Sequence, residues 1–188
     1  MNALDKPTCN KTSRGLSVTA VLVNYNTSVE TFACVQSLQE AIQPNVNLQI
    51  VIVDNSDQVI LPNIDGVIIL RPGENLGLSP AWDLVFRKYG ELSSDYFMFL
   101  NNDAIVAKTF FIELASGISK WGTNCAFGGR IYRLDQKEVI WSRGGSIDAR
   151  KVIVTHDCSN VHRDLVQEGD FETGHISGCC IVIPTHLL

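Results

Sequence analysis

A short, aromatic-rich segment is the feature that most restricts the fold of this chain. Residues 96–100 (YFMFL) have the length of a β-strand and contain no charged group. A strand of this composition has no face to offer to water, so it is expected to be buried on both faces, as in the middle of a parallel sheet. The run ends abruptly at Asn101, Asn102 and Asp103 before apolar residues return. The segment therefore predicts an α/β fold, with a mostly parallel sheet flanked by helices.

The neighbouring sequence supplies the alternation of strands and helices that such a sheet requires. Residues 17–24 (SVTAVLVN) predict a first strand, a helix follows to about residue 41, and residues 48–53 (LQIVIV) predict a second strand. This βαβ unit makes the two strands parallel neighbours. Further elements are expected, in chain order, at residues 67–70 (strand), 79–89 and 109–121 (helices), and 126–133, 139–143, 146–148, 151–155 and 176–184 (strands). The turn-separated strands after residue 121 predict antiparallel or mixed pairing added to the parallel core.

The first two helices carry specific expectations. Thr27 followed by Glu30 has the spacing of a capping box, in which the two side chains satisfy the first backbone N–H groups of a helix. The second helix is expected to stop at Gly90, a residue favoured just after a helix. Five apolar residues of the first helix are expected to face the sheet: Val29, Phe32, Ala33, Leu38 and Ala41.

Composition places the chain among ordinary globular proteins. Of its 188 residues, 45% are hydrophobic and 19% are charged, which allows one domain with a substantial core and excludes a disordered chain. The net charge of −5 argues against a nucleic-acid-binding protein, which would carry a basic face. No apolar run reaches the length of a membrane span, and the N-terminal residues lack the hydrophobic centre of a secretion signal. We expect a flexible leader at residues 1–16, a single domain at residues 17–188, reduced cysteines and a cytoplasmic protein.

Three predicted strands end in clusters of amide and carboxylate side chains, at residues 24–26 (NYN), 54–57 (DNSD) and 101–103 (NND). Because parallel strands bring their carboxyl ends to one edge of the sheet, these clusters are expected to lie side by side, where α/β sheets bind ligands. The chain has neither a G-x-G-x-x-G motif nor a P-loop lysine to hold phosphates. We therefore hypothesise that Asp103 holds a divalent metal, which holds the diphosphate of a sugar nucleotide. The alternative is a set of plain turns, since Asn and Asp bond readily to their own backbone.

Six segments, taken in order, carry a resemblance to a known family: VTAVLVNYN, QIVIVDNSD, ENLGLSPAWD, YFMFLNNDAIV, GGSID and ISGCCIVI. Together they resemble the bacterial family 2 glycosyltransferases, and within them the rhamnosyltransferase-like enzymes of surface-polysaccharide assembly. The resemblance implies a GT-A fold, inversion at the anomeric carbon, and Mn²⁺ or Mg²⁺ as cofactor. It also implies a nucleoside-diphosphate sugar as donor, a saccharide or lipid-linked acceptor, no nucleic acid, and peripheral contact with the inner face of a membrane.

The resemblance also assigns roles to residues at matching positions. Tyr25 matches a position that packs beside the nucleoside, and Asp54 matches the carboxylate that accepts a hydrogen bond from the base. Asn75 and Gly77 match a loop over the nucleotide, with Arg71 assisting there. The remaining residues expected at the nucleotide-sugar site are Asn24, Asn26 and Asn102.

Asp103 matches the last residue of the family's D-x-D-like metal-binding motif. The first position of that motif is Asn101 here, which leaves the metal one protein carboxylate together with neutral or water-mediated contacts. Mg²⁺ and Mn²⁺ accept such ligation when substrate phosphates supply further oxygens. The affinity for metal without nucleotide is therefore expected to be poor.

The catalytic general base is not assigned. In the family it lies in an acidic motif past the segment that matches ISGCCIVI, so we expect it beyond Leu188, in a C-terminal segment that this chain lacks. Asp170, Glu172 and His175 lie near the acceptor side by sequence order, and none is assigned as a replacement. Two alternatives stay open, a non-catalytic module that binds sugar nucleotides and a nucleotidyltransferase of similar fold. The latter usually carries a Gly- and Lys-rich loop near the N-terminus, and LVNYNTSVE has neither residue.

Overall fold

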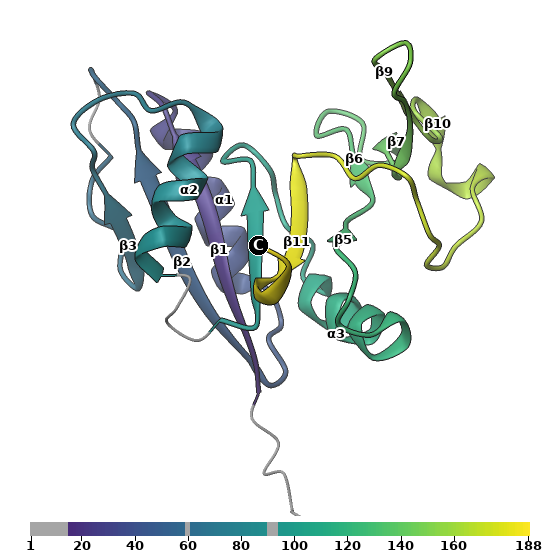
Figure 1. Cartoon of the computed structure of the whole chain (residues 1–188), viewed down its shortest axis with the longest axis horizontal. Helices are drawn as coiled ribbons and strands as arrows, with labels where there is room; N and C mark the ends of the chain where they lie inside the picture. The colour runs from purple at the N-terminus through teal and green to yellow at the C-terminus, as the bar shows by residue number, and fades with distance from the viewer. Residues whose placement is uncertain (1–14, 59–60, 90–93) are drawn as a thin grey trace, which may run out of the picture.

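The computed structural model describes residues 15–58, 61–89 and 94–188, and its largest sheet has six strands in the order β3-β2-β1-β4-β11-β5 (Figure 1). The parallel part consists of β1 (Leu16–Asn24), β2 (Val46–Asp54), β3 (Val67–Leu70) and β4 (Tyr96–Leu100). The predicted βαβ unit is confirmed, because β1 and β2 pair in parallel over their whole lengths. The strand predicted at residues 96–100 is also confirmed, with all five residues buried.

Antiparallel strands extend the sheet beyond β4. β11 (Cys180–Pro184) pairs antiparallel with β4, and β5 (Phe127–Gly128) pairs with β11. The strand predicted at residues 176–184 forms only in its second half. Just before β11 the chain turns, and the Cys179 carbonyl accepts a hydrogen bond of 2.9 Å from the N–H of Asn101. The turn that follows β4 is thereby attached to the start of β11.

Helices cover both faces of the sheet, as the buried strands required. One face of the sheet packs against α1 (Ser28–Glu40) and α3 (Phe110–Trp121), and the other face packs against α2 (Leu78–Tyr89). In Figure 1, α1 and α2 appear on opposite sides of β1. Because side chains alternate along a strand, Leu22 of β1 lies in the core formed with α1 and α3, whereas Val21 lies in the core formed with α2. The predicted stop of α2 at Gly90 lies outside the described residues.

The capping box expected at the start of α1 is absent. Thr27 is the residue before the helix, but its side chain makes no capping hydrogen bond. The Thr27 hydroxyl donates instead to Oδ1 of Asn24, at 3.3 Å. A buried amide at the end of β1 thus competes successfully for the hydroxyl that the helix N-terminus would have used.

The face of α1 that meets the sheet also differs from the prediction. Leu38 and Ala41 are buried as expected. Thr31 is fully buried, and its hydroxyl bonds to Oδ1 of Asn24 at 2.8 Å. Turning this polar side chain inward rotates the helix and exposes three residues that were predicted to face the sheet: Val29, Phe32 and Ala33.

The chain after α3 builds smaller antiparallel sheets, as its short turn-separated strands predicted. One sheet contains β6 (Ile131–Tyr132), β7 (Val139–Ser142) and β10 (Val161–His162). A separate hairpin consists of β8 (Gly145–Asp148) and β9 (Ile153–His156). Two 3-10 helices, η1 (Arg163–Leu165) and η2 (Thr185–Leu187), complete the fold. Figure 1 shows β6, β7, β9 and β10 to the right of the large sheet.

Two observations bear on the expectations about thiols and membrane spans. Within the described residues no helix is long and apolar enough to cross a bilayer. The cysteines described there are free thiols, in agreement with the expected reduced state: Cys34, Cys125, Cys158, Cys179 and Cys180. Cys9 and most of the predicted leader lie outside the described residues, and β1 begins at Leu16, one residue inside the leader's predicted boundary.

Candidate functional site

The polar ends of β1 and β2 are held together by a buried side-chain hydrogen bond. Asn24 stands opposite Asp54 in the strand register, and its Nδ2 donates to Oδ1 of Asp54 at 2.9 Å. The same nitrogen donates to Oγ of Ser56 at 2.8 Å. Asn24 is 0% exposed and Asp54 is 4% exposed. The structure gives Asn24 the role of holding Asp54, and its expected contact with a nucleotide stays a prediction.

Further donors orient the Asp54 carboxylate. The N–H of Leu61 donates to Oδ2 at 2.9 Å, and the N–H of Ser56 donates to Oδ1 at 3.3 Å. Nε of Arg71 lies 4.0 Å from Oδ2. Burial by itself would raise the pKa of Asp54, but the hydrogen bonds from Ser56, Asn24 and Leu61 lower that pKa below its usual value. Asp54 is therefore ionised at neutral pH, the state in which both of its oxygens act only as acceptors.

Asn102, in the turn after β4, joins the same network. Its Nδ2 donates to the hydroxyl oxygens of Thr27 and Thr31, at 2.7 and 2.8 Å. The Thr31 hydroxyl in turn donates to Asn24, which donates to Asp54. The ends of β1, β2 and β4 therefore lie side by side, as predicted for neighbouring strands of a parallel sheet. One continuous series of hydrogen bonds links the three clusters.

The sequence analysis missed Thr27 and Thr31 as members of this network, and it missed the contact that Asn55 makes. Thr27 and Thr31 connect two strand ends through α1. Asn55, which is 1% exposed, donates from Nδ2 to the carbonyl of Gly77 at 3.2 Å and so attaches the loop after β3 to the end of β2. In the sequence, the feature that could have pointed to Thr31 is its polar side chain at a helix position where an apolar core residue would be expected. The side-chain oxygen of Asn55 is buried without a partner in the described part of the chain, which costs free energy unless another group pairs with it.

Tyr25 and Asn26 form an exposed rim beside the buried network. Tyr25 is 45% exposed, and its hydroxyl donates to Oδ2 of Asp57 at 3.4 Å. Nδ2 of Asn26 donates to Oδ1 of the same carboxylate at 2.8 Å, and this hydrogen bond lowers the pKa of Asp57. The loop after β1 is thereby fastened to the loop after β2. The Tyr25 ring remains accessible to a ligand at the edge of the sheet.

The predicted nucleotide loop, residues 71–77, stands next to these residues. Oδ1 of Asn75 accepts a hydrogen bond of 2.9 Å from the N–H of Gly77. Gly77 has φ of +75°, a conformation that side-chain-bearing residues rarely adopt, and no atom lies within 4 Å of the position that a Cβ would take there. A hollow of ≈ 390 Å³ adjoins the loop and is lined by Leu70, Arg71, Pro72, Leu76, Leu84 and Lys88.

Asp103 is exposed in the turn after β4, next to Asn102. Among the described residues, its carboxylate takes part in no hydrogen bond or ion pair. Burial, together with the charge of Asp103, raises the pKa of the Cys34 thiol to about 12 and also raises that of Cys179. Both thiols are therefore neutral at neutral pH in the metal-free protein.

These residues fit a hard divalent cation that also takes ligands from a substrate. The described residues contain no group of three or more His, Cys, Asp and Glu side chains placed to hold a metal ion. Mg²⁺ and Mn²⁺ need no such group, because one or two carboxylates with phosphate oxygens suffice for them. The uncommitted carboxylate of Asp103 meets this requirement.

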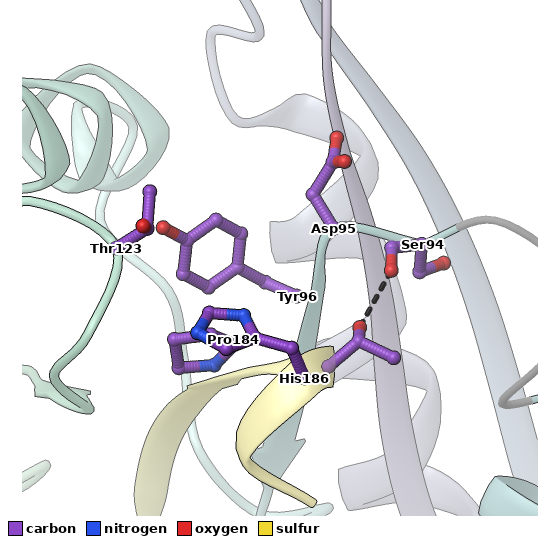
Figure 2. A pocket seen from close by; sticks show the side chains of 7 residues that line it. Ser94, Asp95, Tyr96, Thr123, Pro184 and His186 are labelled. Carbon is purple, nitrogen blue, oxygen red and sulfur yellow. Dashed lines mark hydrogen bonds between the residues drawn. The ribbon is translucent and has the colours of Figure 1, made fainter.

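A larger hollow, of ≈ 430 Å³, lies at the other end of β4 (Figure 2). Its lining consists of Ser94, Asp95, Tyr96, Thr123, Pro184, Thr185 and His186. It contains none of the residues predicted for the nucleotide site. Because ligands of α/β sheets bind beyond the carboxyl ends of parallel strands, we place the candidate site at the Asp54–Asn102 edge.

Comparison with known protein families gives a match over most of the chain. The family model described as Glycosyl transferase family 2 matches residues 19–186. The chain belongs to glycosyl transferase family 2. The resemblance noted in the sequence is confirmed at this level, whereas the rhamnosyltransferase-like subgroup stays a prediction. No curated protein sequence matches the chain.

Solved structures similar to this family 2 chain include residues 1–349 of S. aureus TarS, which are 12% identical with a TM-score of 0.54. That likeness covers 92% of this chain and 48% of the TarS chain, and it shows a GT-A-like fold, as predicted. The mannosyltransferase PcManGT from Pyrobaculum calidifontis, in complex with GDP-Man and Mn²⁺, is 17% identical with a TM-score of 0.49, over 65% of this chain and 37% of that chain. The chain thus spans less than half the length of these two structures.

Proposed function

We propose that this chain is the donor-binding part of a metal-dependent inverting glycosyltransferase. It would move a sugar from a nucleoside diphosphate to a saccharide or lipid-linked acceptor, in the cytoplasm, during surface-polysaccharide synthesis. The observation that supports this function is the hydrogen-bond network that runs from Asp54 through Asn24 and Thr31 to Asn102. It places an ionised carboxylate suited to a base at the same sheet edge as the turn that carries Asp103.

The nucleoside would lie over the ends of β1 and β2. Asp54 would accept a hydrogen bond from the base, and its orientation is set before any ligand arrives. The half-exposed ring of Tyr25 would pack against the base or ribose. The loop containing Asn75 and Gly77 would cover the nucleotide from the side of β3.

The diphosphate would lie beside Asp103. Breaking the bond between sugar and phosphate adds negative charge to the leaving nucleoside diphosphate, and a bound Mn²⁺ or Mg²⁺ supplies the compensating positive charge. The Asp103 carboxylate would hold the cation, with diphosphate oxygens as further ligands. Asn102 keeps this turn in place through its bonds to Thr27 and Thr31.

The acceptor hydroxyl must lose a proton as it attacks the opposite face of the sugar, which requires a general base. Asp170 is paired with Lys120 at 3.3 Å, and we assign it no such role. The function proposed for the described residues is therefore donor and metal binding.

Calorimetric titration tests this function. UDP, GDP and dTDP are titrated in turn into the protein in the presence of Mn²⁺, and at least one of them should bind. Asp54→Ala and Asp103→Ala should each weaken that binding, and the double variant should abolish it. Asp135→Ala is a matched control, because Asp135 is exposed and its carboxylate pairs with Arg133 at 3.7 Å, far along the chain from the site. No heat with any of the nucleotides, or unchanged binding in the double variant, would overturn the proposal.

A further inference from the structure

The β8–β9 hairpin exposes an unusual amount of apolar surface. Ile147, Val152, Ile153 and Val154 are 53%, 87%, 51% and 46% exposed. We call these four residues the apolar hairpin tip. Ile147 stands opposite Val154 across the hairpin, and Ile153 is the neighbour of Val154 along β9, so the apolar side chains occupy both faces of the two-stranded sheet. Within the described residues, these side chains therefore keep about half or more of their surface exposed on both faces of the hairpin end.

Val152 holds its apolar side chain outward at a conformational cost. Its φ is +56°, in the left-handed region where a β-branched residue is a clear outlier. The turn that imposes this conformation is fixed by Asp148, whose Oδ1 accepts hydrogen bonds from the N–H groups of Arg150 and Lys151 at 3.0 and 3.2 Å. Asn or Gly would adopt the same backbone more easily and would expose less apolar surface. An outlier of this kind is a reason to look for a function of the side chain.

Basic residues flank the tip. Arg150 and Lys151 precede Val152, and only Lys151 has a carboxylate partner, Asp148 at 3.5 Å. The Arg150 guanidinium makes no hydrogen bond or ion pair within the described residues. The hairpin therefore carries one positive charge, that of Arg150, which no carboxylate in it offsets, although the whole chain carries a net charge of −5. In Figure 1 the hairpin stands clear of the large sheet, at the end of the molecule toward which β4 points.

We propose that the apolar hairpin tip inserts into an anionic lipid surface, with Arg150 and Lys151 at the headgroups. A protein partner or a second copy of the chain would cover one face of the hairpin, whereas the interior of a lipid layer surrounds a projecting hairpin on every side. Two contributions hold proteins at such surfaces: apolar side chains lie below the lipid headgroups, and cationic side chains lie among the headgroups. The inference rests on the proposed function, in which the acceptor can be lipid-linked. It deepens that function by naming the apolar hairpin tip as the surface that meets the membrane.

Co-sedimentation with vesicles tests the tip directly. The whole chain, without nucleotide, should sediment with vesicles of phosphatidylglycerol and much less with vesicles of phosphatidylcholine. Val152→Asn should lower the partition coefficient by about tenfold or more, the effect of withdrawing one buried aliphatic side chain from the lipid. The melting temperature should not fall, because Asn accepts the positive φ. The matched control is Val29→Asn, since Val29 is 79% exposed on α1 and should not affect vesicle binding.

The charge contribution is tested separately. Arg150→Gln together with Lys151→Gln should weaken binding to the anionic vesicles, and added salt should weaken the binding of the unaltered chain. The proposal is overturned if the chain does not bind phosphatidylglycerol vesicles, if Val152→Asn binds them as well as the unaltered chain, or if Val29→Asn loses as much binding. It is also overturned if Val152→Asn instead abolishes a concentration-dependent dimer. Because no nucleotide is present, these outcomes are independent of whether the chain binds a sugar nucleotide.

Discussion

Asp54 shows how a buried carboxylate at the end of a strand is held in one orientation by its neighbours. Its two oxygens accept from the side chain of Asn24 and from the backbone N–H groups of Ser56 and Leu61, so the carboxylate has one orientation and one charge state. Asn24 is held in turn by the hydroxyl of Thr31. A group that is already oriented loses less entropy when a ligand binds to it.

Substitution of Asp54 has a predicted pH signature. Asp54→Asn should lower the free energy of unfolding at neutral pH by about 1–3 kcal/mol, because an amide nitrogen would face one of the buried donors. The folded pKa of Asp54 lies below its unfolded value of about 3.9, so its stabilising contribution is present above that value and is lost as the pH falls through the folded pKa. Urea unfolding of both proteins should therefore show a difference that shrinks in acid. A difference that is independent of pH would contradict this account of Asp54.

At the scale of elements, patterns that depend on neighbouring residues were predictable, and those that depend on distant partners were not. The strand at residues 96–100 was found from its composition, because an apolar run of that length fits few other environments. The orientation of α1 was predicted wrongly at Val29 and Phe32, since apolar spacing alone ignores the polar strand end beneath the helix. Thr31 faces inward because Asn24 and Asn102 need its hydroxyl.

The same distinction applies to the site. The polar residues after β1, β2 and β4 could be predicted to meet, because parallel strands share an edge. The connections through Thr27, Thr31 and Asn55 could not, because they depend on the strand register and on the rotation of α1. The sequence therefore indicates where the site is, whereas the hydrogen-bond partners emerge only from packing.

Thr31 provides a test of the link between α1 and the site. Thr31→Val keeps the shape of the side chain but leaves Asn24 and Asn102 each short of a partner, so the free energy of unfolding should fall by about 1–3 kcal/mol. Nucleotide affinity should also fall, because the side chain of Asn102 loses one of the two hydroxyl partners that hold it. Thr31→Ser keeps the hydroxyl and should preserve the affinity. Equal affinity in the Val and Ser variants, measured by calorimetry, would show that the network does not support the site.

At the scale of the whole molecule, the order of the strands in the sheet brings separate loops together at one candidate site. β1 lies between β2 and β4, so the carboxylate of Asp54 and the turn that carries Asp103 stand on either side of one strand end. A nucleoside diphosphate has its base and its charged phosphates at opposite ends, which matches that separation of roles. In the proposed function, with a single carboxylate from the protein, the cation and the diphosphate would each supply ligands or charge that the other needs.

The central claim is that Asp103 holds a divalent cation together with a nucleoside diphosphate, and the free Mn²⁺ signal in electron paramagnetic resonance measures this most directly. Mn²⁺ alone should bind weakly. Addition of the nucleoside diphosphate identified by calorimetry should tighten Mn²⁺ binding by about tenfold or more beyond the affinity of the free nucleotide for the ion, and by linkage Mn²⁺ should tighten nucleotide binding equally. Asp103→Asn should remove this coupling. Equally tight Mn²⁺ binding without nucleotide, or coupling that survives Asp103→Asn, would contradict the account.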